Sequence, residues 1–128
     1  MVVGLLRITL HIPEAQSLKD RRAAVRRAVE RVRARYNVSV AEVGDLERWQ
    51  LATVAVTCVS NDRAYVNEVL DKVTSTIASA GAALVTHREM EIQSYADREP
   101  IGESLEVRAP PKTPMSMLSE DDDADDET

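Results

Sequence analysis

Two hydrophobic periodicities alternate along this chain, and their order limits its fold more than any other feature. Apolar residues recur every second position where a β-strand is expected and every three to four positions where a helix is expected. The predicted elements, in chain order, are a strand at 2–12, a helix at 17–36, strands at 38–44 and 49–60, a helix at 60–81 and a strand at 83–93. The order is therefore βαββαβ.

This order predicts a ferredoxin-like α+β fold, a four-stranded antiparallel sheet with two helices on one face. Right-handed crossovers place both helices on the same side, which leaves the other sheet face open. By alternation that face carries Val3, Leu5, Arg7, Thr9, Leu51, Thr53, Ala55, Thr57 and Val59. Because a mixed apolar face is rarely left to water, we expect a partner, a second copy or the C-terminal segment to cover it. The candidate interaction residues are Leu5, Arg7, Thr53 and Thr57.

The composition indicates a single domain with an aliphatic core. The chain has 128 residues, contains no Phe, and has only 3% aromatic residues, so Val, Leu, Ile and Ala must fill the core. One cysteine cannot form an internal disulfide, which favours a reducing compartment. No apolar run approaches the roughly 20 residues that span a bilayer. We expect a cytoplasmic protein that does not bind a membrane.

The charge is distributed unevenly between a domain and a tail. Residues 1–93 carry 13 Lys/Arg and 11 Asp/Glu, a net charge of +2. Residues 94–128 carry 3 Lys/Arg and 11 Asp/Glu, a net charge of −8. Prolines and acids leave the second segment too little apolar surface to offset the entropy of ordering it. We therefore predict a ferredoxin-like domain at 1–93 and a flexible, disordered acidic tail at 94–128. Within the tail, Ile101, Leu105 and Val107 are candidates for a short added strand.

The first predicted helix is strongly basic. Residues 17–36 contain eight Lys/Arg and two acids. At 100° per residue, Lys19, Arg22, Arg26 and Arg33 fall within about 60° of one another, beside the apolar stripe. Such a row can neutralise phosphates, and its binding would weaken steeply with salt. Two alternatives remain open: the long arginine stems cover the core edges without a ligand, or the row binds an acidic protein. The acidic tail either contacts this helix or only keeps the chain soluble.

Three phrases of the sequence, VVGLLRITLHIP, SLKDRR and RYNVSVAEVGDLERWQLATVAVTCVSND, resemble the YlxP-like family of small bacterial proteins. The resemblance covers residues 1–93. It implies a ferredoxin-like fold and a bacterial cytosolic protein whose genes commonly lie beside those for translation initiation and ribosome maturation. It brings no established catalytic residues to these positions. The long acidic tail departs from the usual compact family member.

Little in the sequence indicates catalysis. His87, Glu89 and Glu91 share a strand face that His11 approaches, but a solvated strand shows the same pattern, and Arg7 is expected to pair with one of the glutamates. Cys58 is expected in the core, and Trp49 packs at a strand entrance or is an exposed contact. The polar residues next to the helix starts, Ser17, Ser60, Asn61 and Asp62, are explained as caps. We therefore predict no catalytic residue, metal or cofactor.

Together these observations predict a non-enzymatic binding protein. It would assist ribosome assembly or translation by contacting ribosomal RNA or a ribosomal subunit through Lys19, Arg22, Arg26 and Arg33. The alternative is a homodimeric interaction or regulatory module that uses the open sheet face and binds no nucleic acid. Salt separates the two, because phosphate binding weakens with salt and an apolar dimer does not.

Overall fold

The computed structural model describes residues 1–44, 50–81 and 83–108. Its elements, in order, are β1 (Val2–His11), α1 (Leu18–Arg35), β2 (Ser39–Val43), β3 (Leu51–Ser60), α2 (Arg63–Ala78) and β4 (Leu84–Ser94). The predicted βαββαβ order is confirmed. Trp49 lies outside the described residues.

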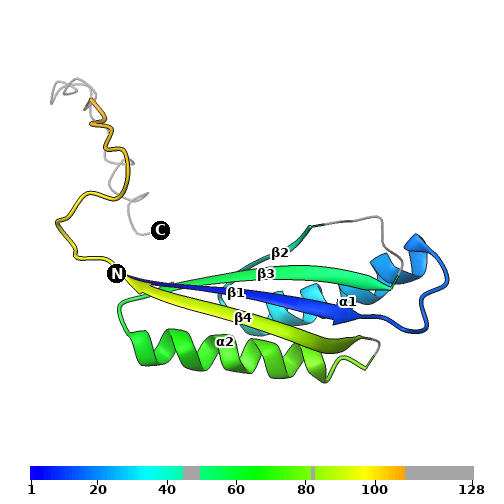
Figure 1. Cartoon of the computed structure of the whole chain (residues 1–128). Helices are drawn as coiled ribbons and strands as arrows, with labels where there is room; N and C mark the ends of the chain where they lie inside the picture. The colour runs from blue at the N-terminus through cyan, green and yellow to red at the C-terminus, as the bar shows by residue number, and fades with distance from the viewer. Residues whose placement is uncertain (45–49, 82, 109–128) are drawn as a thin grey trace, which may run out of the picture.

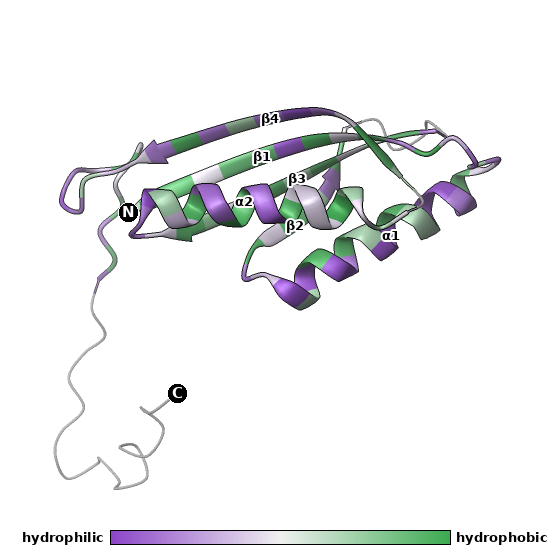
Figure 2. Ribbon diagram, turned by 90° about the horizontal axis from the view of Figure 1, so that it is seen from below, coloured by the Kyte–Doolittle hydropathy of each residue, from purple (hydrophilic) through white to green (hydrophobic). Residues whose placement is uncertain are grey.

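The four strands form one antiparallel sheet in the order β2-β3-β1-β4. β1 lies inside the sheet and pairs with β3 from Val2 to His11. Both helices lie against one face of this sheet, and no helix of the described residues lies on the other face (Figure 1). Figure 2, seen from the helix side, shows α1 and α2 lying against the same face of the sheet. This is the predicted ferredoxin-like fold.

The core lies between the sheet and the two helices and is built from aliphatic side chains. β1 alternates along its length, so its even-numbered residues face the helices. The fully buried aliphatic side chains are Leu6, Ile8, Leu10, Val32, Val54, Val56, Val66, Leu70, Val73 and Ile77. These Val, Ile and Leu side chains pack closely between the sheet and the helices. The core therefore needs no aromatic ring at its centre.

Both helix starts use the caps that the sequence predicts. The Asp20 N–H donates to Ser17 Oγ at 3.2 Å, so Ser17 caps α1, and Asp20 Oδ2 accepts from the Gln16 N–H at 3.1 Å, which ties the residue before the cap to the first turn. Asp62 caps α2 by accepting from the N–H groups of Ala64 and Tyr65. These bonds fix where each helix begins relative to the preceding strand.

The last strand differs from the predicted alternation. Unbroken period-two alternation would place Leu84 on the same face as Met90 and Ile92, but the register between β1 and β4 shifts between Thr9 and Leu10. This bulge inverts the facing of the residues before it. Val85 consequently packs against the core, and Leu84 is 55% exposed.

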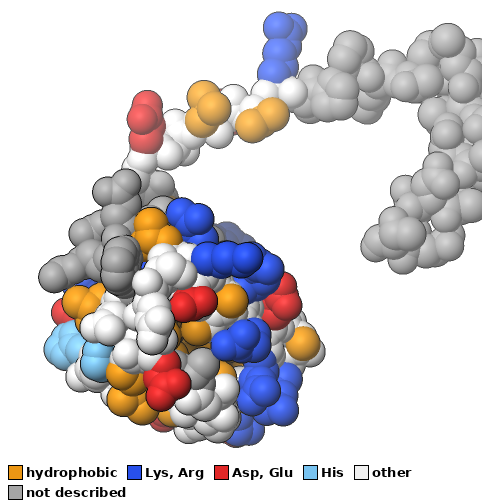
Figure 3. Space-filling view, turned by 90° about the vertical axis from the view of Figure 1, so that its right-hand side faces the viewer, with side chains coloured by type: hydrophobic (Ala, Val, Ile, Leu, Met, Phe, Trp, Pro, Cys, Tyr) orange, Lys and Arg blue, Asp and Glu red, His pale blue; other side chains and the backbone are white. Residues whose placement is uncertain are grey.

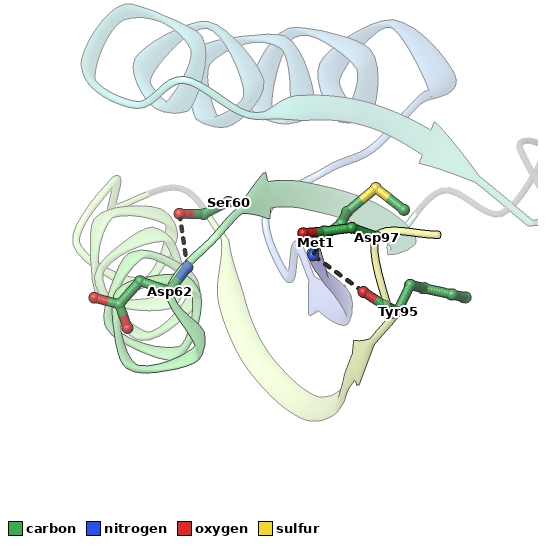
Figure 4. A network of polar contacts seen from close by, with 5 residues as sticks. All are labelled: Met1, Ser60, Asp62, Tyr95 and Asp97. Atoms are coloured by element: carbon green, nitrogen blue, oxygen red, sulfur yellow. Dashed lines mark hydrogen bonds and ion pairs between the residues drawn. The ribbon is translucent and has the colours of Figure 1, made fainter. Parts of the chain in front are cut away.

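Beyond β4 the described chain leaves the sheet. The Tyr95 N–H donates to the Met1 carbonyl at 2.8 Å. The Met1 amino group donates back to the Tyr95 carbonyl at 3.1 Å, a bond that Figure 4 shows. The strand suggested by Ile101, Leu105 and Val107 does not form, and all three side chains are exposed. Three apolar residues separated by charges bury too little surface to hold such a strand. Up to residue 108, this segment does not lie over the open sheet face (Figure 1).

Gly4 allows α2 to approach β1 closely. A Cβ atom built at this position would overlap Val66 Cγ1 and lie 2.8 Å from Leu70 Cδ1, both on α2. Glycine is therefore needed here for space, because its backbone lies directly beneath the helix.

Substitution of this glycine tests how tightly α2 packs on the sheet. We expect Gly4→Val to lower the free energy of unfolding by about 1–3 kcal/mol, because the added methyls force α2 away from β1. Urea unfolding followed by circular dichroism measures this. The control is Thr9→Val, on the opposite face of the same strand, which should change stability by less than about 0.5 kcal/mol. Equal stability of Gly4→Val and the parent chain would contradict the packing described.

Candidate nucleic-acid interface

One arginine of the basic helix points into the protein. Arg21 is 1% exposed; its Nε donates to the Leu51 carbonyl at 2.8 Å, and its Nη2 pairs with Glu42 Oε2. The interactions join α1 to the ends of β2 and β3. A buried guanidinium is tolerated when its donors are satisfied in this way. The sequence analysis treated 17–36 as one basic segment and did not predict the burial of Arg21.

A second arginine, Arg33, also binds the sheet. It is exposed, yet its Nη2 donates to the Val40 carbonyl of β2 at 2.9 Å. β2 is an edge strand of the sheet, and this bond ties it to α1. Arg33 was predicted as a contact residue, and the structure gives its guanidinium an additional role in holding β2.

The other predicted contacts, Lys19, Arg22 and Arg26, are exposed. Arg27, Arg31 and Arg35 are exposed as well and form a second row, four residues apart, which flanks the buried stripe of α1 on the side opposite the first row. We call Lys19, Arg22, Arg26, Arg27, Arg31 and Arg35 the basic face. Within the described residues, none of the six forms an ion pair or a side-chain hydrogen bond. The second row was missed, although its four-residue spacing is visible in the sequence.

Cations elsewhere in strands and helices have partners. Arg7 Nε donates to Glu89 at 2.6 Å, and Arg88 pairs with Asp71 at 2.8 Å. A hydrogen bond from Lys72 to Glu68, four residues earlier on α2, raises the pKa of Lys72. Arg63 donates to the Ile92 carbonyl at 3.1 Å. The charge left without a partner in the described domain is therefore concentrated on α1.

The surface view agrees with this distribution. In Figure 3, Lys and Arg side chains gather along one side of the molecule, and few acidic side chains interrupt them. Only Asp20 and Glu30 are acidic on α1. The helix thus offers the solvent a strip of positive charge with little local compensation.

The open sheet face brings together the second set of predicted residues. Leu5 lies directly beside Thr57, Arg7 occupies the next row beside Ala55, and Thr53 lies opposite Thr9. A hollow of about 380 Å³ on this face is lined by Leu5, Arg7, Val43, Ala55, Glu89, Met90 and Glu91. Leu5 is 48% exposed and Val59 is 62% exposed. This face can accept apolar groups.

The predicted pairing of Arg7 with a glutamate of the last strand is confirmed, since Arg7 contacts Glu89. His87 Nε2 lies 4.0 Å from Glu89 Oε2, and within the described residues no three His, Cys, Asp or Glu side chains form a metal-binding group. Cys58 is buried in the core, where desolvation raises the pKa of its thiol. Neither helix in the described part of the chain combines the length and hydropathy that crossing a bilayer requires.

The fold and surfaces define a small ferredoxin-like domain with a basic helix. Residues 3–90 match the family described as protein of unknown function (DUF503). The chain is 32% identical over 78 residues to the uncharacterized protein YlxP of Bacillus subtilis (strain 168). The matched region covers 61% of this chain and 85% of that protein. The chain belongs to the DUF503 family, and its resemblance to YlxP-like proteins is confirmed.

Three solved structures are similar to this chain at TM-scores below 0.5. The de novo designed protein LFR1 1 with ferredoxin fold has a TM-score of 0.46 and 8% identity, covering 85% of this chain and 100% of the design. The de novo designed protein Foldit4 has a TM-score of 0.43 and 16% identity, and the match covers 74% of this chain and 98% of the design. A C-terminal segment of the alpha subunit of aIF2 from Pyrococcus abyssi has a TM-score of 0.39 and 17% identity. The match covers 77% of this chain and 52% of that one. These similarities concern the fold alone.

Removing the partner of the buried arginine tests the role of that pair. We expect Glu42→Ala to lower the free energy of unfolding by about 3 kcal/mol, because Arg21 would remain buried without a carboxylate. Denaturant unfolding measures this. Asp71→Ala is the control, since it breaks the exposed pair with Arg88 and should cost less than about 1 kcal/mol. Similar losses in the two variants would show that burial adds nothing to the Arg21 pair.

Proposed function

We propose that this protein is a non-enzymatic RNA-binding protein that contacts the phosphate backbone through the basic face of α1. The observation that carries the proposal is the group of six exposed cations without a partner among the described residues, in a domain whose other described cations are bonded. Arg33 is expected to join the contact at its edge while it holds β2.

Helix geometry suits this role. Residues four apart lie on one side of a helix, about 6 Å apart along its axis, so each row presents its cations in a regular line. A guanidinium can bind two oxygens of one phosphate, which favours arginine over lysine here. Each contact releases counterions, so binding should weaken steeply as salt rises. These contacts carry little sequence information, because they address the backbone and not the bases.

The sheet face is less suited to RNA. Single-stranded RNA commonly stacks its bases on aromatic residues of a sheet in the RNA-recognition fold. The open face described above instead presents Leu5, Arg7, threonines and alanine on its central strands. This absence of stacking side chains on the described central strands favours α1. Ribosomal RNA is the first RNA to test, because the family resemblance implies genes that lie beside those for translation.

Charge reversal on one row tests the proposal. We expect Arg22→Glu with Arg26→Glu to weaken binding to ribosomal subunits at least tenfold at low salt and to reduce the slope of log affinity against log salt by about two. Co-sedimentation across a salt series measures both quantities. The control is Arg98→Glu with Arg108→Glu, which makes the same charge change at exposed positions outside α1. Equal loss in both variants, or no binding by the parent chain at low salt, would contradict the proposal.

A second candidate function is a homodimeric interaction module. The half-exposed Leu5 and the hollow beside it on the open sheet face support this candidate. An apolar face of this kind is commonly covered by another molecule. Its association would depend on burial of apolar surface and would survive high salt.

Molecular mass in solution tests the second candidate. If the face dimerises, Leu5→Lys should produce monomers at concentrations where the parent chain is dimeric, because the new charge would be buried in the interface. Sedimentation velocity at low and high salt measures the mass. Arg22→Glu with Arg26→Glu should leave a sheet-face dimer intact. A parent chain that is monomeric at high concentration would exclude this function.

A further inference from the structure

The basic face has a counterpart of opposite charge in the same chain. Residues 119–128, SEDDDADDET, contain seven acids and no Lys or Arg. The six cations of the basic face have no partner among the described residues. Two nearly equal and opposite charge clusters on one chain attract each other, and this attraction is strongest at low ionic strength.

We propose that residues 119–128 of this chain dock on the basic face of its own α1 and compete there with polyanions. Carboxylates offer arginine the same paired oxygens as phosphate does, so the acidic segment can occupy the row that RNA phosphates would use. The competition rests on the proposed function, whereas the docking itself depends only on the charges of the two segments.

Chain length permits this docking. The last bonds that tie the chain end to the sheet are those between Tyr95 and Met1. From Pro100 to Arg108, the described residues make no hydrogen bond to the sheet or the helices. The 24 residue-to-residue steps from Tyr95 to Ser119 span at most about 85 Å when extended. α1 has 18 residues and is about 27 Å long, so every cation of the basic face is within reach.

Tethering makes a weak contact effective. A segment joined to the domain by a short linker acts at an effective concentration in the millimolar range. A free RNA must displace the tethered acidic segment before it can bind, so docking should lower the apparent affinity for RNA. This effect should be largest at low salt, where the attraction between the segment and α1 is strongest. The other described cations of strands and helices are bonded to carboxylates or carbonyls, which leaves α1 as the preferred docking surface.

Nuclear magnetic resonance of the full chain tests docking directly. The variant replaces three acids of the segment, Asp121→Asn, Asp122→Asn and Asp123→Asn, and its control replaces three acids of the described segment, Glu99→Gln, Glu103→Gln and Glu106→Gln. The two variants have the same net charge. We expect the first to shift the Arg22, Arg26, Arg27 and Arg31 side-chain Nε–H signals, and the control to shift them much less. The differences should vanish at 0.5 M salt and stay the same on tenfold dilution.

Competition is measured with poly(U) as the probe. At low salt we expect the full chain with all seven acids of 119–128 neutralised to bind about tenfold more tightly than the parent chain, and the two affinities to converge at high salt. Equal α1 signals in the parent and the Asp121/Asp122/Asp123 variant would overturn the docking, as would shifts that disappear on dilution, which would place the segment on a second copy. Salt-sensitive α1 shifts without any poly(U) binding would support docking and contradict the proposed function.

Discussion

The domain depends on the interior position of β1, which pairs along its length with β3 on one side and β4 on the other. Its even-numbered side chains form the centre of the core, and Gly4 leaves α2 the space to lie directly on the strand. Because β1 is held on both sides, the two crossover helices have a fixed platform to pack against. A displacement of β1 would change its register with both β3 and β4 and would move the surface on which α2 packs.

α1 has a harder packing problem, since it must be anchored while carrying many like charges. It packs through small residues, Ala24 and Ala28, and through valines such as Val25 and Val32. One arginine, Arg21, is taken into the protein, where β2 and β3 satisfy its donors. Arg21 anchors α1 while the remaining cations of the helix stay in solvent, and Glu42 compensates this buried charge. The same helix thus packs into the fold on one side and presents exposed cations to the solvent on the other.

The fold also separates the two surfaces that could bind other molecules. Both helices lie on one side of the sheet, so α1 and the open sheet face are on opposite sides of it (Figures 1 and 2). A partner on the sheet would not block α1. RNA binding and dimerisation are therefore compatible on geometric grounds, and evidence for one would not argue against the other. Occupation of α1 by the acidic segment would act on the first surface alone.

The sequence by itself determined the element order, the sheet's two faces, the cap at Ser17 and three candidate caps at Ser60, Asn61 and Asp62, because periodicity and capping depend on local residues. It also placed Arg7 beside a glutamate of the last strand, since facing follows alternation. Only the tertiary structure decided that Arg21 is buried, that Arg33 bonds an edge strand and that a bulge turns Leu84 outward. Each of these depends on a residue distant in sequence, such as Glu42, Val40 or Thr9, and local periodicity cannot specify which distant groups meet.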